Sequence, residues 1–270
     1  MPSPLIAPVD LFAALDSSDP PLVIDARPAH EFARGLIAAA VHLDLWGVSL
    51  IDTSAAPLRA FMWMIAHVFS QRGVTTERPV VVYETDSGIR AARLFWFLEY
   101  LGHPNVRVLD GGVRAWTAAG LPLTRDTRAP ETSSWHGTPV PERVATWEEV
   151  LGFLERPEVA IVDTRSHDEY LGRLVRAGRG GAIPGAVNLE WTRNLDASGR
   201  FKSVEALRSM YEPLGVLPDK TVVTYCQGGY RAAHSYLALR ILGYADVRNY
   251  TGSWKEWGDR ADLPIAHPPA

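Results

Sequence analysis

Short runs of β-branched and aromatic residues alternate with stretches of helical periodicity along the chain. Val80–Tyr83 and Thr221–Tyr225 are β-branched or aromatic at every position, which is typical of strands buried on both faces of a parallel sheet. Helical patterns follow these runs, at Ala91–Tyr100 and Ala232–Leu242. The alternation predicts an α/β fold in which an open parallel sheet is flanked by helices.

The chain repeats its own pattern of blocks. The block LVIDARPAHEF at Leu22–Phe32 returns as AIVDTRSHDEY at Ala160–Tyr170. The block LGHPNVRVLDGGVRAW at Leu101–Trp116 returns as LGYADVRNYTGSWKEW at Leu242–Trp257. Because the blocks recur in the same order, we expect two tandem domains of one fold, which arose by duplication.

The domain limits follow from a change in composition. Residues 125–142, RDTRAPETSSWHGTPVPE, are rich in Pro, Ser and Thr and lack periodicity, so we expect them to form a linker. The first domain is then 1–124 and the second 143–270. Thr146 with Glu149 three residues later predicts a capping box, and therefore a helix start, just after the linker.

The loop after Thr221–Tyr225 carries the strongest chemical signal. It contains the lone cysteine and ends in an arginine: Cys226, Gln227, Gly228, Gly229, Tyr230 and Arg231. Ligands of open α/β sheets bind at the carboxyl ends of strands, and two glycines let backbone N–H groups turn inward ahead of a helix N-terminus. Such a cradle binds anions and stabilises a thiolate. Most lone cysteines are small buried hydrophobes, but this setting favours a reactive thiol.

The first half has no nucleophile at the matching place. When Tyr83 and Arg90 are aligned with their counterparts, Glu84 stands where Cys226 does. A carboxylate cannot take the place of a thiolate nucleophile, so we expect the first domain to be catalytically silent.

The loop resembles the active-site loop of rhodanese-type sulfurtransferases, in which a cysteine is followed by four residues and an arginine. GAIPGAVNLEW at Gly181–Trp191 resembles the family's Gly-His-Ile-Pro-Gly-Ala signature, with Ala182 in place of the histidine. The blocks DGGVRAW and TGSWKEW resemble its C-terminal region. The resemblance covers both repeats and matches tandem thiosulfate and mercaptopyruvate sulfurtransferases. It implies that the Cys226 thiolate takes sulfane sulfur from a small-molecule donor, holds it as a persulfide, and passes it to cyanide, a thiol or another thiophilic acceptor, without a cofactor.

The resemblance also implies where the donor binds. An insertion in the second half carries Arg173, Arg176 and Arg179, and this region supplies substrate-binding cations in the family. We favour Arg179, which is nearest the signature; the alternative is a solvated basic loop. The other candidate substrate contacts are Gln227, Gly228, Gly229, Tyr230 and Trp191.

Two departures from the family pattern bear on the donor. Mercaptopyruvate-specific members carry an arginine where this chain has Glu169, and their loop typically runs Cys-Gly-Ser-Gly-Val-Thr. Both differences favour thiosulfate or a related donor, and 3-mercaptopyruvate is the alternative.

The net charge and the residue counts bear on partners, compartment and metal binding. A formal net charge of -4 gives no general attraction to nucleic acid or anionic membranes, and we expect neither as a partner. A single cysteine cannot form an intramolecular disulfide, and Met1–Asp16 does not read as a secretion signal, so we expect the cytoplasm. The eight histidines lack ligand spacing, so no metal site is predicted.

Two other functions use the same features. A Cys-based phosphatase or arsenate reductase would also pair a cysteine with an arginine, but the phosphatases of this fold place five residues between them, and here there are four. A non-catalytic or protein-directed persulfide carrier, with a protein as sulfur acceptor, is compatible with the same loop.

Overall fold

The computed structural model describes residues 3–269, so the outermost ends of the two predicted domains lie outside the described residues. The elements of the N-terminal half are β1 (Leu5–Ile6), α1 (Pro8–Leu15), β2 (Leu22–Asp25), α2 (Ala29–Phe32), β3 (Val41–His42), α3 (Ala55–Ser70), β4 (Val80–Tyr83), α4 (Ile89–Tyr100), β5 (Val106–Leu109) and α5 (Gly112–Ala118).

The C-terminal half repeats this succession and adds short 3₁₀ helices. Its elements are η1 (Pro141–Arg143), β6 (Val144–Ala145), α6 (Trp147–Phe153), β7 (Val159–Asp163), α7 (His167–Tyr170), β8 (Val187–Asn188), η2 (Trp191–Asn194), α8 (Val204–Tyr211), η3 (Glu212–Leu214), β9 (Thr221–Tyr225), α9 (Tyr230–Ile241), β10 (Val247–Tyr250) and α10 (Ser253–Asp259).

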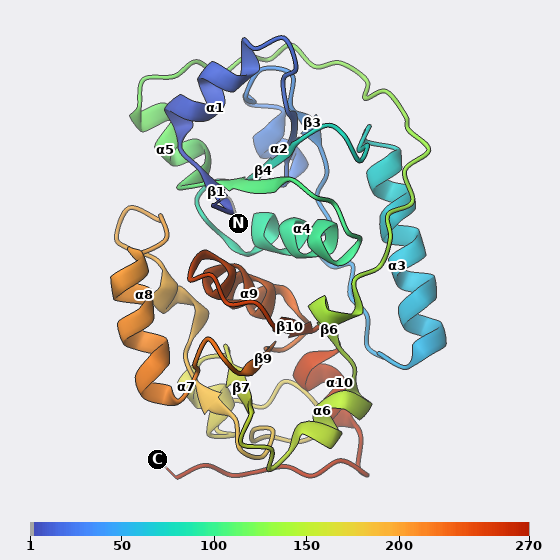
Figure 1. The fold of residues 1–270 in the computed structure, drawn as a ribbon, viewed down its shortest axis with the longest axis vertical. Helices are drawn as coiled ribbons and strands as arrows, with labels where there is room; N and C mark the ends of the chain where they lie inside the picture. Colours follow the sequence, from blue (N-terminus) through green and yellow to red (C-terminus); the bar gives the residue numbers. More distant parts are fainter. Residues whose placement is uncertain (1–2, 270) are drawn as a thin grey trace. The chain divides into compact units, whose positions relative to one another are not determined.

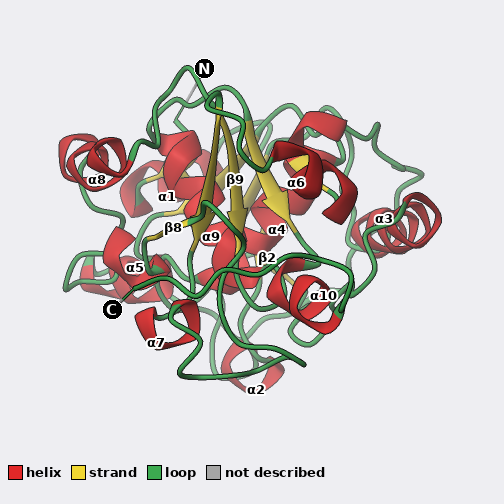
Figure 2. Ribbon diagram, turned by 90° about the horizontal axis from the view of Figure 1, so that it is seen from below, coloured by secondary structure: helices red, strands yellow, loops and turns green. Residues whose placement is uncertain are grey.

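Each half builds a five-stranded sheet in which every pairing is parallel. The strand orders are β1-β5-β4-β2-β3 and β6-β10-β9-β7-β8, which are the same order when the halves are matched. The strands of each sheet lie among helices (Figures 1 and 2). The predicted α/β fold of two tandem domains, each an open parallel sheet flanked by helices, is thereby confirmed. The described residues include no helix long and apolar enough to cross a membrane.

The chain divides into two compact units that exchange short segments. The first unit comprises the chain up to Val48, Phe61–Val140 and Leu195–Phe201, and the second comprises Ser49–Ala60, Pro141–Asn194 and the chain from Lys202 on. Each half of the chain thus contributes one segment to the other half's unit. Simple division of the sequence at a linker does not describe this arrangement.

The linker segment forms no regular element before Pro141, yet it belongs to the first unit. Thr138 N–H donates to the Leu101 carbonyl (2.8 Å), and Val140 N–H donates to the Tyr100 carbonyl (2.7 Å). These bonds hold the segment along the end of α4, because buried or half-buried backbone groups must find partners.

The predicted capping box forms at the start of α6. The Thr146 hydroxyl accepts from Glu149 N–H, and the Glu149 carboxylate accepts from Thr146 N–H. The segment Ser49–Ala60 is fastened close by. Thr53 donates its N–H and its hydroxyl to the buried Glu256 carboxylate (2.6 and 2.7 Å), and its hydroxyl oxygen accepts from Trp147 N–H (2.9 Å).

A buried triad holds the end of the strand that leads to the cysteine. The Arg165 guanidinium forms a fork on the Asp163 carboxylate, and the Tyr225 hydroxyl donates to the same carboxylate (2.6 Å). The first unit repeats these contacts with Asp25, Arg27 and Tyr83. Since a unit without the cysteine keeps the same triad, the triad is a feature of the fold that does not depend on the nucleophile.

Candidate active site

Cys226 lies at the carboxyl end of β9, between the strand and α9. It is only 1% exposed, whereas Gln227, Gly228 and Tyr230 beside it are half-buried. Gly229 has a φ of +84°, and a Cβ there would lie 2.9 Å from the Thr251 carbonyl oxygen. The tight curl of the loop therefore requires glycine at this position.

Backbone N–H groups converge on the sulfur. Gly229 N–H donates to Cys226 Sγ at 3.2 Å, and the backbone of Gly228 and Ala232 adds further hydrogen bonds. The donors come from the loop and the first turn of α9, whose macrodipole also favours negative charge there. The sequence predicted this cradle from the two glycines and the helix start.

Arg231 supplies the fixed positive charge. Its guanidinium hydrogen-bonds to the Cys226 side chain. It also forms a bidentate pair with the buried Glu169 on α7, whose carboxylate accepts at 2.6 and 2.9 Å. Burial acts to raise the pKa of the Glu169 carboxyl, but the bonds and charge of Arg231 lower it to about 2. Glu169 is therefore ionised at neutral pH.

The thiol is more acidic than an ordinary cysteine. Burial acts to raise the pKa of Cys226, but the charge of Arg231 and the converging N–H groups outweigh it, so the pKa lies below its usual value. A cysteine that was merely a buried hydrophobe would have its pKa raised. The geometry therefore fits a thiolate nucleophile.

The three arginines of the insertion have different partners. Arg179 donates to four main-chain carbonyls around the end of α10, those of Trp257, Gly258, Arg260 and Leu263. Its guanidinium thus holds the C-terminal segment, and the role of Arg179 as the donor-binding cation stays a prediction that these contacts do not favour. Arg173 faces Asp168 (3.6 Å) and is exposed.

Arg176 is the insertion arginine that lies beside the loop. Its main-chain carbonyl accepts from the Gln227 side chain (2.9 Å), and its guanidinium lies 3.8 Å from the Glu169 carboxylate. More than half of its side chain is exposed, so the guanidinium is accessible to a ligand. Trp191 packs edge-on against the buried His234 on α9, with ring centroids 4.9 Å apart; its predicted contact with substrate stays a prediction.

The matching loop of the first unit is closed around its own carboxyl group. Glu84 is buried, and one of its oxygens accepts from the N–H groups of Arg90 (2.7 Å) and Ala91 (3.0 Å). Burial raises the pKa of Glu84 to about 7. Arg90 turns elsewhere, pairing with Asp44 and stacking over the Trp46 ring. The loop keeps the cradle without a nucleophile.

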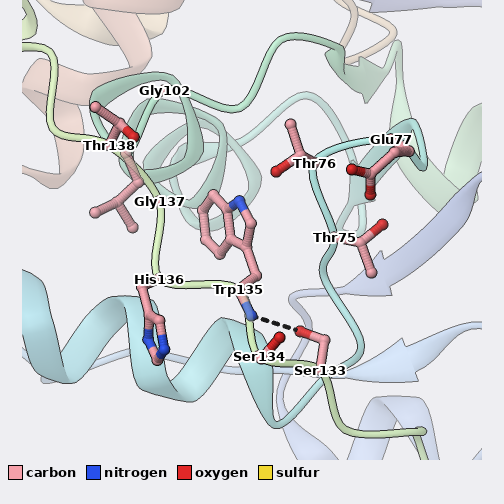
Figure 3. A pocket seen from close by; sticks show the side chains of 11 residues that line it. Thr75, Thr76, Glu77, Gly102, Ser133, Ser134, Trp135, His136, Gly137 and Thr138 are labelled. Atoms are coloured by element: carbon pink, nitrogen blue, oxygen red, sulfur yellow. Dashed lines mark hydrogen bonds between the residues drawn. The ribbon is translucent and has the colours of Figure 1, made fainter.

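A separate polar hollow of about 420 Å³ lies in the first unit (Figure 3). It is lined by the turn before β4 (75–77), by the residues that follow α4 (101–102) and by part of the linker segment (133–138). Trp135 N–H donates to the Ser133 hydroxyl at its edge (3.2 Å). It contains none of the residues of the Cys226 loop, so we assign it no part in the chemistry. Within residues 3–269 no group of three or more His, Cys, Asp or Glu side chains gathers that could hold a metal ion.

Sequence reasoning missed two residues that touch the loop or its arginine. Glu169 was considered only as a departure from a family pattern, although Ser166 three residues before it signals the capping box that holds it. Ser253 was not singled out. Its hydroxyl accepts from the N–H groups of Cys226 (3.0 Å) and Gly229 (3.1 Å), and the only sequence signal is a serine where the matched block has Gly112.

Comparisons with known proteins agree with this geometry. Residues 8–119 and 146–260 each match the family model described as Rhodanese-like domain. The chain is 36% identical over 265 residues to a thiosulfate sulfurtransferase of Azotobacter vinelandii, covering 97% of this chain and 96% of that protein. It is 37% identical over 214 residues to the sulfur carrier protein TtuD of Thermus thermophilus, covering 74% and 75%.

A solved structure shares the fold. The anaerobic ergothioneine biosynthesis enzyme from Chlorobium limicola aligns with a TM-score of 0.85 at 22% identity, covering 99% of this chain and 71% of that chain. At this identity the likeness concerns the fold alone.

Proposed function

The chain belongs to the rhodanese-like family, with two domains of that family in tandem, and we propose that it is a thiosulfate sulfurtransferase whose nucleophile is Cys226. The observation that carries the proposal is the Cys226 loop. A thiol with a lowered pKa lies under converging N–H groups, and Arg231 follows it after four residues.

The reaction has two steps. The Cys226 thiolate attacks the outer sulfur of thiosulfate, the S–S bond of the donor breaks, and sulfite leaves with the electron pair. The enzyme then carries a persulfide anion, whose charge the loop N–H groups and Arg231 stabilise. Cyanide or a thiol attacks the outer sulfur in the second step, and the Cys226 thiolate leaves and is regenerated.

The site favours thiosulfate over 3-mercaptopyruvate as donor. Glu169 places a second negative charge beside Arg231, and its carboxylate accepts from both terminal nitrogens of the guanidinium, which a donor carboxylate would otherwise use. Arg176 is then the cation that we propose for the sulfonate end of the donor, since its guanidinium is exposed beside the loop.

The test compares the two donors with cyanide as acceptor and measures thiocyanate. We expect turnover with thiosulfate that is lost in Cys226→Ser and kept in Glu84→Gln, which changes the matching position of the silent unit. A preference for 3-mercaptopyruvate would overturn the donor assignment. Thiosulfate turnover that survives Cys226→Ser would overturn the nucleophile.

A second candidate is a persulfide carrier that delivers sulfur to a protein. The similarity to a protein named sulfur carrier supports it, and the same loop would serve it. A carrier would gain one sulfur atom by mass from thiosulfate, keep it in the presence of small acceptors, and lose it to a protein thiol. Rapid release of the sulfur to cyanide would argue for the enzyme instead.

We also propose the cytoplasm as the compartment. The chemistry needs Cys226 as a free thiol between turnovers, and a reducing compartment keeps it so. Localisation of the tagged full-length chain by cell fractionation tests this directly.

A further inference from the structure

Ser253 has a backbone conformation that residues with side chains rarely adopt. It is fully buried, begins α10, and has a φ of +54°, in the left-handed region. Its hydroxyl donates to the Tyr250 carbonyl (2.7 Å) and accepts from the N–H groups of Cys226 (3.0 Å) and Gly229 (3.1 Å). One side chain therefore bonds to both the first and the fourth residue of the Cys226 loop.

The first unit shows the same turn without the hydroxyl. Gly112 stands at the matching position with the same φ of +54°. The backbone bonds between turn and loop are also the same: Trp254 and Lys255 N–H donate to the Cys226 and Gln227 carbonyls (2.9 and 3.0 Å), and Val113 and Arg114 N–H donate to the Glu84 and Thr85 carbonyls (both 2.9 Å). The unit with the nucleophile differs from the silent one by carrying a side chain at this turn.

We propose that Ser253 is a positioning residue for Cys226, whose hydroxyl holds the loop so that its N–H groups stay aimed at the sulfur. The proposal deepens the proposed function, because it concerns the same loop. A left-handed backbone is unfavourable for serine, and glycine would avoid that cost. The hydroxyl offsets it by accepting from the buried Cys226 N–H, whose removal from water must be compensated, and from Gly229 N–H, which it shares with the sulfur.

Removing the hydroxyl has two opposed effects on the thiol. Gly229 N–H lies 3.1 Å from the Ser253 hydroxyl oxygen and 3.2 Å from the Cys226 sulfur, so it is shared between them. If the loop kept its shape, the freed N–H would bind the sulfur more strongly and lower the pKa of the thiol. If the hydroxyl positions the loop, its loss disperses the donors and raises the pKa.

The charged groups near the sulfur are the same in wild type and variants. Arg231 on α9 touches it, Glu169 on α7 acts through Arg231, and Arg176 faces Glu169 from the insertion. On α10 itself, Lys255 pairs with Asp259. The Glu256 carboxylate accepts from the N–H and the hydroxyl of Thr53, which carries no charge. A shift of the thiol pKa in a Ser253 variant therefore reports a change in the N–H groups of the loop rather than in the surrounding charges.

The experiment measures the pH dependence of Cys226 alkylation by iodoacetamide in the full-length protein. Ser253→Gly and Ser253→Ala both remove the hydroxyl, and Ser209→Ala, an exposed serine on α8, is the control. We expect the midpoint to rise by about one pH unit in both variants, so that alkylation at pH values well below the wild-type midpoint slows roughly ten-fold, and to stay in place in the control. A midpoint that is unchanged or lower in the Ser253 variants overturns the proposal.

Folding does not limit this test. Gly112 shows that glycine adopts this turn without strain, so Ser253→Gly remains informative if Ser253→Ala, which keeps the left-handed strain, does not fold. Alkylation also needs no sulfur donor. A raised midpoint without thiocyanate formation from any donor would refute the proposed function and leave the positioning role standing.

Discussion

The pairing of Glu169 with Arg231 makes a measurable contribution to stability that depends on pH. In the folded protein the pKa of Glu169 falls from an ordinary 4.5 to about 2. At roughly 1.36 kcal/mol per pH unit this corresponds to at most about 3 kcal/mol. Because the folded pKa is the lower one, the contribution is complete above pH 4.5 and is lost as the pH falls toward 2. About three-fifths of it is lost between pH 7 and pH 3.

The perturbation is Glu169→Gln, which keeps the size of the side chain and removes its charge. We expect urea unfolding at pH 7 to show the variant less stable than wild type by up to about 3 kcal/mol, since the Arg231 charge is left buried without its partner. At pH 3 the difference should shrink to about 1 kcal/mol, because wild-type Glu169 is losing its advantage. Other carboxyl groups titrate in both proteins and cancel in the difference.

A difference between the two proteins that stays constant from pH 7 to pH 3 would refute this reasoning. It would mean that Glu169 stabilises the fold through its size or its cap on α7 rather than through its charge on Arg231. The control combines Arg231→Met with Glu169→Gln. Because the two groups act as a pair, the double variant should lose less stability than the sum of the losses of the two single variants.

Three further predictions follow from the two loops and the insertion. Arg231→Met should raise the midpoint of Cys226 alkylation above that of wild type, because the positive charge beside the thiolate is lost; an unchanged pH profile would remove Arg231 from its assigned role. Glu84→Gln should be more stable than wild type at pH 8 by up to about 3 kcal/mol and equal to it at pH 4. Burial raises the pKa of Glu84 to about 7, so ionisation of this carboxyl destabilises the wild-type fold as the pH rises from 4.5 through 7. Urea unfolding at both pH values tests the sign. Arg179→Met should lower the free energy of unfolding by about 2 kcal/mol and leave the KM for thiosulfate unchanged, whereas Arg176→Met should raise that KM; the reverse pattern would restore Arg179 as the donor-binding cation.

Much of the fold could be predicted because it depends on neighbours in the sequence. The strands at Val80–Tyr83 and Thr221–Tyr225 have the predicted limits, and the capping box at Thr146 forms as expected. The helices begin two residues earlier than predicted, at Ile89 and Tyr230, because the loop glycines lead directly into the first turn. Strand periodicity and caps involve residues within a few positions of each other, so the sequence contains the information needed.

The exchange of segments between the units could not be read from composition. The segment that contains Thr53 lies between β3 and β4 of the first unit's sheet in sequence, and its contacts with Glu256, 203 positions away, and with Trp147 show that it packs on the second unit. A linker and a long loop look alike in sequence. The partner that satisfies their backbone groups is chosen by the folded chain.

The sequence by itself determined the duplication, the parallel α/β fold and the place of Cys226 at the end of a buried strand. The tertiary structure alone decided which partners each arginine contacts. Arg176 and Arg179 are three residues apart and chemically identical, yet one lies beside the Cys226 loop and the other holds main-chain carbonyls near α10. Likewise Glu169 meets Arg231 across 62 positions. Long charged side chains reach several partners from one backbone position, so their pairing is set by distances that exist only once the elements have packed.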